Sequence, residues 1–159
     1  MISADLQVLS DKAAISEVLH RYAMAIDLRD WSLLRECFTD QMQADFRSFG
    51  VRDIYQGPAD DWVEAIRSTI AGLDVTQHLT ANHSCRVDGD EARLTAYLQA
   101  LHRLQVERGD SDYTCGGYYT CELQRSGPDW RISAYSLTVT WDRGNRDILR
   151  QAQRKSAGR

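Results

Sequence analysis

An α+β fold is predicted for this chain of 159 residues, and three observations predict it. Apolar residues recur at helical spacing in the first 73 positions, whereas apolar and polar residues alternate from about residue 75 to residue 141. Turn signals such as Asp-Gly separate the alternating stretches. Three helices followed by an antiparallel meander form one domain over residues 1–141, and residues 142–159 form a polar, basic tail.

Three helices are expected before the meander. Ser10 is a favourable N-cap for the first, whose apolar residues fall at i, i+3 and i+4 and give it one buried face. Asp30 caps a short second helix, and Pro58 suits the first position of the third. The expected spans are residues 11–28, residues 31–37, and a third helix from Pro58 to a stop at Gly72.

The strands of the meander are expected to curve. Cys115-Gly116-Gly117 interrupts the third of them and indicates a bulge or bend. Such curvature closes a sheet into a cone, so we predict a cone-shaped barrel of curved antiparallel sheet packed against the three N-terminal helices. The expected strands are 75–87, 91–106, 113–125 and 130–141, with one or two short strands within 42–56.

Composition excludes several classes of protein. The net charge of −4 leaves no electrostatic footprint for nucleic acid. No apolar run approaches the roughly 20 residues that span a membrane, and the stretch Met1–Asp5 lacks the features of a signal peptide. We therefore expect a cytoplasmic protein. None of the four cysteines forms a Cys-x-x-Cys pair, so buried free thiols are expected.

The tail from 142 to 159 is rich in arginine and has few apolar anchors beyond Ile148 and Leu149. A solvated, partly disordered helix is expected there. The alternative is a lid over a cavity or an arm that binds a partner.

His78 and Asp27 are the main candidates for chemistry. Side chains alternate along a strand, so His78, Thr80 and Asn82 are expected to share one face. Asp27 lies where the apolar stripe of the first helix ends. If that helix crosses the concave face of the sheet, the carboxylate would hold one ring nitrogen of His78 and make the other a better base. The alternatives are a structural histidine and a solvated aspartate at a helix end.

Two further residues are candidate catalytic groups. Tyr22 lies five residues before Asp27 on the same helix, and its hydroxyl could polarise a carbonyl or assist a departing oxygen. The alternative is a core tyrosine. His102 ends a small, apolar strand face, as expected for a polar group at the rim of a cavity, and is either a second acid or a strand-end histidine.

We expect five residues to contact a substrate: Asn82, Leu98, Tyr118, Tyr55 and Trp141. Asn82 would orient a substrate oxygen or tie down a loop. No metal site is predicted, because His78 and His83 are an odd number of residues apart and should point to opposite faces. The chain has neither a Gly-x-Ser-x-Gly elbow nor a phosphate-binding glycine loop, and no cofactor is predicted.

From about Asp11 to Trp141 the chain resembles the SnoaL-like family of the nuclear-transport-factor-two-like superfamily, whose fold is a cone-shaped α+β barrel. The matching pieces are Ala14-Ile15 through Arg21-Tyr22 with Asp27, Phe38-Thr39-Asp40, Tyr55-Gln56-Gly57-Pro58, Thr76-Gln77-His78 with Asn82, Val87-Asp88-Gly89-Asp90, Gly116-Gly117-Tyr118-Tyr119 and Trp130-Arg131-Ile132. The fold hosts many reactions, so the match does not name one.

The resemblance implies roles for the candidate residues. Scytalone dehydratase is similar at Asp27, His78 and His102, but Ile26 stands where that enzyme has a tyrosine. Hexachlorocyclohexane dehydrochlorinase has a His–Asp dyad that falls on His78 and Asp27, with Tyr22 in place of its lysine. Bile acid 7-dehydratase resembles the chain best, since its Tyr, Asp and His fall on Tyr22, Asp27 and His78. SnoaL polyketide cyclases also use an acid–base residue in the corresponding cavity.

The sequence therefore predicts a cofactor-independent lyase or isomerase, dehydratase-like, that uses a His–Asp general base on a hydrophobic, oxygenated ring compound. The alternatives are a non-catalytic module of the same fold that binds a small ligand or a protein, and the small subunit of a ring-hydroxylating dioxygenase. The fold usually assembles through its outer sheet faces, where Tyr97, Leu101 and Tyr119 are expected, so a homodimer or larger homo-oligomer is predicted.

Overall fold

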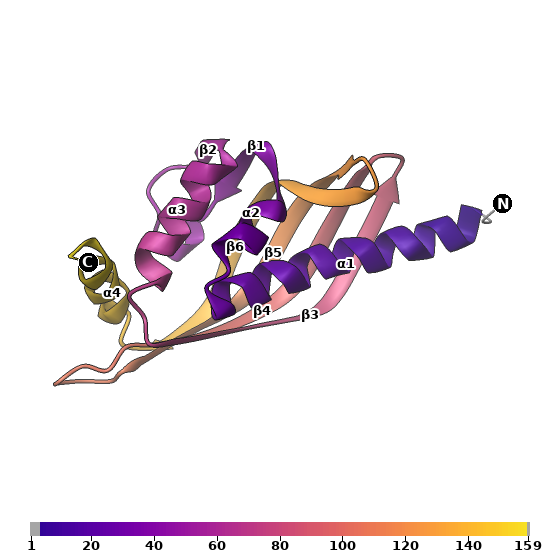
Figure 1. Ribbon diagram of the computed structural model, residues 1–159. Helices are drawn as coiled ribbons and strands as arrows, with labels where there is room; N and C mark the ends of the chain where they lie inside the picture. Colours follow the sequence, from indigo (N-terminus) through magenta and orange to yellow (C-terminus); the bar gives the residue numbers. More distant parts are fainter. Residues whose placement is uncertain (1–3, 159) are drawn as a thin grey trace.

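A curved, unclosed six-stranded sheet carries its helices on one side (Figure 1). The structure is a computed structural model that describes residues 4–158. Its helices are α1 (Ala4–Leu28), α2 (Trp31–Glu36), α3 (Ala59–Ile70) and α4 (Asp147–Ala157), with a 3₁₀ turn η1 (Arg47–Phe49). Its strands are β1 (Phe38–Asp45), β2 (Tyr55–Pro58), β3 (Val75–Asp88), β4 (Glu91–Arg103), β5 (Asp112–Ser126) and β6 (Asp129–Gly144). The predicted α+β class and cone-type fold are confirmed.

The sheet is mixed rather than wholly antiparallel. Its strand order is β2-β1-β6-β5-β4-β3, and β3 to β6 form the expected antiparallel meander. At the other edge β1 pairs parallel with β6, with Ala44 beside Tyr135. This pairing joins segments about 90 residues apart, so no local sequence pattern reports it.

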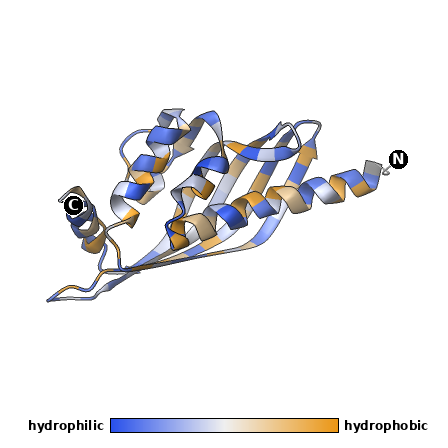
Figure 2. Ribbon diagram, in the orientation of Figure 1, coloured by the Kyte–Doolittle hydropathy of each residue, from blue (hydrophilic) through white to orange (hydrophobic). Residues whose placement is uncertain are grey.

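Helix α1 lies across the concave side of the sheet, over β3, with its N-terminus projecting beyond the strands (Figure 1). Its apolar stripe is buried against the sheet, and the hydropathy colouring in Figure 2 shows the alternation of apolar and polar residues along the helix. The helix begins at Ala4 rather than after Ser10, because residues 4–10 hold no breaker that would end it. Pro58 lies just before α3, which ends at Ile70.

Two irregularities shape the sheet. Gly116 pairs with Trp141 while Gly117 pairs with Val139, so Thr140 is an extra residue and β6 bulges at the predicted glycine pair. In β3 the register shifts between Ala81 and Ser84, and Asn82 has a positive φ of 53°.

The bulge in β3 corrects the expected alternation. His83 lies on the same side as His78, not the opposite one: its ring stands 4.9 Å from that of His20 on α1, and its Nε2 lies 3.3 Å from Thr80 Oγ1. The inserted residue shifts the phase of every side chain after Asn82, which sequence spacing alone does not show.

Residues 147–157 form a packed helix, not the solvated segment expected from their charge. Ile148 and Ala152 of α4 are fully buried, and α4 lies against α3. Gly72 permits this approach, because a side chain there would clash with the backbone of Ala152. None of the helices in residues 4–158 is long and apolar enough to cross a membrane.

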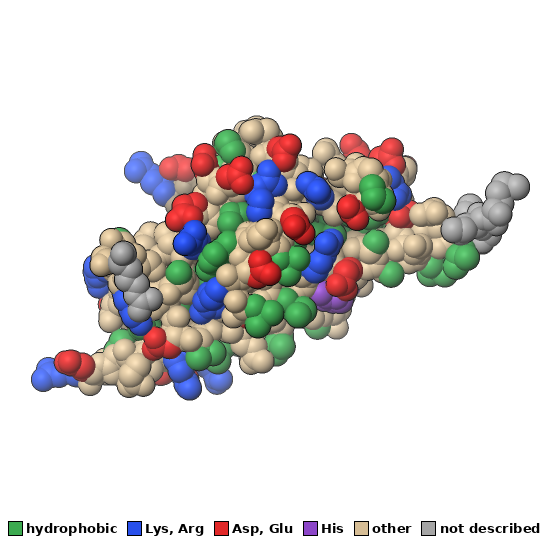
Figure 3. All heavy atoms as spheres, in the orientation of Figure 1, with side chains coloured by type: hydrophobic (Ala, Val, Ile, Leu, Met, Phe, Trp, Pro, Cys, Tyr) green, Lys and Arg blue, Asp and Glu red, His purple; other side chains and the backbone are tan. Residues whose placement is uncertain are grey.

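The outer face of the sheet carries several apolar side chains. Leu79, Tyr97 and Trp141 are exposed and line a shallow groove there with Tyr118. Tyr97 and Tyr119 were both expected on this face. Tyr97 lies there, but Tyr119 is buried on the inner face, because it lies two residues before the buried Cys121 on the same strand. All four cysteines are free thiols. Acidic and basic side chains are interspersed on the helical side of the molecule (Figure 3).

Candidate active site

Asp27 lies near the C-terminal end of α1, where the helix passes over the start of β3. Its Oδ2 accepts the backbone N–H of His78 at 2.7 Å, and its Oδ1 lies 2.7 Å from His78 Nδ1. Both carboxylate oxygens therefore engage one residue of β3. This double contact fixes the imidazole relative to the helix.

The environment of the pair determines its protonation. The side chain of His78 is 7% exposed and that of Asp27 is 20% exposed. Burial opposes ionisation of Asp27, but hydrogen bonds from the ring and backbone of His78, with the charge of His78, outweigh it and lower the carboxyl pKa. With Asp27 ionised, Nδ1 of a neutral His78 carries the proton and donates it to the carboxylate. The lone pair is then on Nε2.

Arg29 holds the end of α1 in place. This residue has a left-handed backbone conformation (φ 61°), and its guanidinium turns back toward the helix end. Its Nη1 donates to the carbonyl oxygen of Ile26 at 2.8 Å and to Thr76 Oγ1 at 2.6 Å. Because Thr76 lies two residues before His78, this arginine ties the strand that carries the histidine to the helix that carries Asp27.

His102 of β4 lies next to the pair. Its ring centroid stands 5.7 Å from that of His78, and the two rings are nearly perpendicular. The residue is 4% exposed, and burial, followed by the charge of His78, lowers its pKa to about 3. His102 is therefore neutral near pH 7. Its Nδ1 is buried and has no hydrogen-bond partner among the described residues.

Tyr22 belongs to a group of buried hydroxyls. Its hydroxyl lies 3.3 Å from that of Tyr135, which also accepts the indole N–H of Trp62 at 2.6 Å. Burial raises the pKa of Tyr22 to about 12, against the hydrogen bonds from neighbouring tyrosines. The ring of Tyr119 stands 5.7 Å away, edge to face. The hydroxyl of Tyr22 is therefore protonated and is surrounded by aromatic side chains.

A mostly apolar cavity of about 380 Å³ brings three of the four predicted catalytic residues to one space, while Asp27 stands behind His78 and is not part of the wall. Tyr22, His78 and His102 all line it, as does the expected substrate-contacting residue Leu98. The remaining walls come from α1, α3, η1 and the residues beside it, the inner sheet face and α4; they are Ile26, Phe46, Phe49, Val51, Trp62, Ala65, Ile66, Thr69, Ile70, Ala100, Cys115, Tyr119, Leu137, Leu149 and Gln153.

Four residues expected to contact a substrate lie elsewhere. Asn82 is exposed at the β3 bulge. Tyr118 and Trp141 line the groove on the outer face of the sheet. Tyr55 stacks on Trp62 and donates its hydroxyl to the carbonyl of Pro58 at 2.6 Å. The structure places none of these four in the wall of the cavity that holds His78.

Sequence reasoning missed most of the cavity wall. Tyr119 is paired with the inner-face residue Ala96 of β4, and its phase with the buried Cys121 and Leu123 on the same strand was the available signal. Leu149 and Gln153 come from α4, whose position no pattern indicated. Within residues 4–158, no three His, Cys, Asp or Glu side chains are grouped so that they could hold a metal ion.

Comparison with known proteins agrees with this architecture. A model of the SnoaL-like domain matches residues 7–136. The chain belongs to the SnoaL-like domain family. An uncharacterized protein of Mycobacterium tuberculosis is 30% identical over 126 residues, which cover 78% of this chain and 82% of that protein. A scytalone dehydratase of Aspergillus fumigatus is 24% identical over 160 residues, covering 90% of each chain.

Among solved structures, a protein of Kribbella flavida is similar to this SnoaL-like chain with a TM-score of 0.85 and 28% identity. The match covers 90% of this chain and 99% of that one. The likeness therefore extends over nearly the whole fold, the sheet and the helices above it together.

Proposed function

We propose that this SnoaL-like protein is a cofactor-independent lyase or isomerase of the dehydratase type that acts on a hydrophobic, oxygenated ring compound. One observation carries the proposal: a carboxylate holds Nδ1 of a histidine that lines an apolar cavity. This arrangement leaves Nε2 as the basic nitrogen in a shielded space. Similarity to a scytalone dehydratase supports the same class of reaction.

The first step is removal of a proton from the carbon beside a substrate carbonyl. Nε2 of His78 takes the proton, and the electrons of the C–H bond move into an enolate. The imidazolium that forms is stabilised by Asp27, whose carboxylate is already in contact with Nδ1. The low polarity of the surroundings strengthens this attraction relative to water.

The second step completes a dehydration or an isomerisation. In a dehydration the enolate electrons form a carbon–carbon double bond, the bond to a β-hydroxyl breaks, and the proton held by His78 leaves with that oxygen as water. In an isomerisation the same proton returns to a different carbon. His102 and Tyr22 supply neutral polar groups on the cavity wall for the oxygens of the substrate.

The proton abstraction is tested without knowledge of the leaving group. Cyclic ketones and β-hydroxy ketones are incubated with the protein in D₂O, and exchange of the α-proton is followed by NMR alongside the absorbance of any conjugated enone. We expect turnover by the wild type and a loss of at least about a hundredfold in His78→Ala and in Asp27→Asn, both folded. Unchanged turnover in either variant would remove the dyad from the proposal.

A ligand-binding module without turnover is the second candidate. The open cavity of about 380 Å³ supports binding of a small molecule as well as catalysis. The same NMR experiment distinguishes a ligand-binding module from an enzyme. A compound that binds with micromolar affinity and undergoes neither α-proton exchange nor elimination favours the binding module.

We also propose that two or more copies associate through the outer sheet face. Tyr97 is 58% exposed and Trp141 45% exposed, and both lie beside Leu79 in the outer groove. Tyr97→Glu should shift the mass in solution, measured by light scattering, to that of a monomer. A wild type that is monomeric at high concentration would contradict this proposal.

A further inference from the structure

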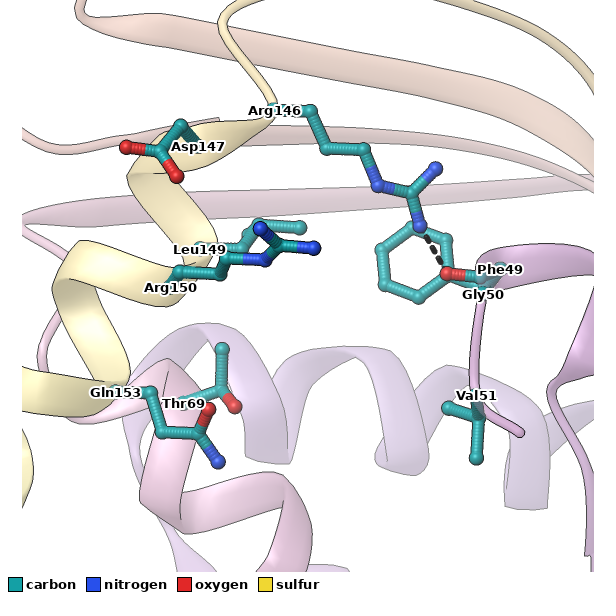
Figure 4. Close-up of a pocket in the computed structure, with 9 residues that line it drawn as sticks. All are labelled: Phe49, Gly50, Val51, Thr69, Arg146, Asp147, Leu149, Arg150 and Gln153. Carbon is teal, nitrogen blue, oxygen red and sulfur yellow. Dashed lines mark hydrogen bonds between the residues drawn. The ribbon is translucent and has the colours of Figure 1, made fainter. Parts of the chain in front are cut away.

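A second, more polar chamber of about 470 Å³ adjoins the apolar cavity (Figure 4). It lies between the first turns of α4, the end of α3 and the segment that follows η1. Five residues line both spaces: Phe49, Val51, Thr69, Leu149 and Gln153. We call this chamber the vestibule. The two spaces therefore lie side by side and have part of their walls in common.

Arg146 forms one side of the vestibule and is already engaged. Its Nη2 donates to the carbonyl oxygen of Phe49, as the dashed line in Figure 4 shows, and its guanidinium stands 5.0 Å from the centroid of the Phe49 ring. Its Nη1 lies 3.8 Å from Asp142 Oδ2. Arg146 therefore holds the vestibule wall while it contributes positive potential.

Arg150 lies one helical turn further along α4 and differs from Arg146. Its side chain runs across the vestibule toward the ring of Phe49 (Figure 4). None of the described residues forms a hydrogen bond or ion pair with it, so all of its donors are available to a ligand. A guanidinium with open donors is suited to bind a planar oxyanion through two parallel hydrogen bonds.

The acidic residue of the vestibule does not cancel this charge. The carboxylate of Asp147 points away from Arg146 and Arg150 (Figure 4), and its Oδ2 accepts the side-chain amide of Gln151 at 3.0 Å. The polar groups nearest the vestibule interior are the Thr69 hydroxyl and the Gln153 amide, both neutral. The vestibule is thus locally cationic, although the chain carries a net charge of −4.

We propose that the substrate of this protein is a carboxylic acid, with its carboxylate bound by Arg150 in the vestibule and its ring in the apolar cavity beside His78. This inference rests on the proposed function for the reaction at the ring, but not for the binding of the anion. The two chambers have opposite character, so they admit an amphipathic molecule in one orientation only. The charged end stays in the vestibule, because an unpaired charge is strongly disfavoured in the apolar cavity.

The test compares a matched acid and amide. 2-Naphthylacetate and 2-naphthylacetamide have nearly the same shape and differ in charge. Each is titrated against the protein loaded with the neutral fluorescent dye N-phenyl-1-naphthylamine, and displacement of the dye gives the affinity. We expect the acid to bind the wild type about threefold to tenfold more tightly than the amide, the range for a partly exposed charge pair.

Two variants locate the preference. Arg150→Gln should abolish the difference between acid and amide, whereas Arg154→Gln, which removes the same charge one turn further along α4 and outside the vestibule, should retain it. Raising the salt concentration to about 0.5 M should narrow the difference in the wild type. Equal affinity of acid and amide for the wild type, or equal losses in the two variants, would overturn the proposal.

The outcome is separable from that of the proposed reaction. His78→Ala should keep the preference for the acid while it loses turnover. If the protein prefers the acid to the amide but no ketone undergoes proton exchange, the anion site is supported and the proposed reaction is contradicted. If α-proton exchange occurs but the acid and the amide bind with equal affinity, the proposed reaction is supported and the anion site is contradicted.

Discussion

Helix α1 carries two shielded carboxylates, Asp11 near its beginning and Asp27 at its end, and their partners differ. Asp11 accepts two hydrogen bonds from Arg125, at 3.0 and 2.9 Å, and one from the Trp130 indole at 3.1 Å. The bond from Arg125 is the largest influence and, against burial, holds the pKa of Asp11 down to about 2. Asp27 has a histidine as its partner.

The difference teaches how to interpret a buried acid. Arginine and the indole N–H only donate, so the cluster at Asp11 has no group that accepts a proton near pH 7. Its role is to fasten α1 to the β5–β6 hairpin. The imidazole beside Asp27 lines a cavity, and its second ring nitrogen is the group that we propose to take a proton from a substrate. The partner, more than the burial, therefore separates a structural carboxylate from the one that we propose to be catalytic.

The largest expected effect is on turnover. Asp27→Asn should lower kcat on an active ketone by about a hundredfold or more, because an amide neither fixes the His78 tautomer nor stabilises the imidazolium. Asp11→Asn should leave kcat within about twofold. Steady-state kinetics of the two variants measure both values. A comparable loss in each would show that the two carboxylates are not functionally distinct.

The second expected effect is on stability, where the order of the two variants is reversed. Asp11→Asn should lower the free energy of unfolding by about 2 kcal/mol, since Arg125 and Trp130 lose a charged acceptor. Asp27→Asn should cost less, because the Asp27 side chain is 20% exposed against 8% for Asp11, so water can solvate the freed donors more readily. Urea denaturation followed by tryptophan fluorescence gives both values. A larger loss from Asp27→Asn would reverse the comparison.

The arginine near each carboxylate sharpens the contrast. Arg125→Met should destabilise the protein by about 1.5 kcal/mol and leave the pH profile of kcat unchanged. Arg29→Met should lower kcat by about threefold to tenfold, because the contacts with Ile26 and Thr76 that position Asp27 are lost. Arg29→Lys should recover part of that loss. A purely structural Arg29 would change stability without changing kcat.

The last expected effect is a two-part response of stability to acid. The lowered pKa of His102 means that the unfolded chain binds a proton first, so stability falls as the pH decreases from about 6.5 toward 3. The lowered pKa of Asp11 adds a loss as the pH falls from about 4 through 2. His102→Gln should lack the first part, and Asp11→Asn should show a smaller second part, of which the lowered pKa of Asp27 keeps a share, as measured by urea titrations between pH 7 and 2. Identical profiles in the three proteins would contradict these assignments.

The dyad was predictable because each member follows from a short pattern. The apolar stripe of α1 ends at Asp27, and the alternation at Thr76–Thr80 turns His78 toward the helix. The resemblance to SnoaL-like enzymes indicated that Asp27 and His78 form a pair. The family and the general fold are confirmed by the match over residues 7–136.

Features that depend on distant packing were not predictable. The bulge at Asn82 inserts one residue and reverses the side of His83, and the parallel pairing of β1 with β6 joins segments far apart in the chain. The charged composition of α4 concealed two buried residues, Ile148 and Ala152, that pack on α3. Tyr118, Tyr55 and Trp141 resembled ligand contacts because they are aromatic, although the pleat of the sheet or local stacking directs them elsewhere.

Helix α4 follows the last strand and has few ties to the rest of the chain beyond α3 and the vestibule. It supplies Leu149 and Gln153 to the cavity and Arg150 to its mouth. Substitutions in α4 would therefore change the walls of both spaces and leave the contact between Asp27 on α1 and His78 on β3 in place. A replacement for this segment would have to keep the buried Ile148 and Ala152 that pack on α3, and the other positions of the helix would be open to change.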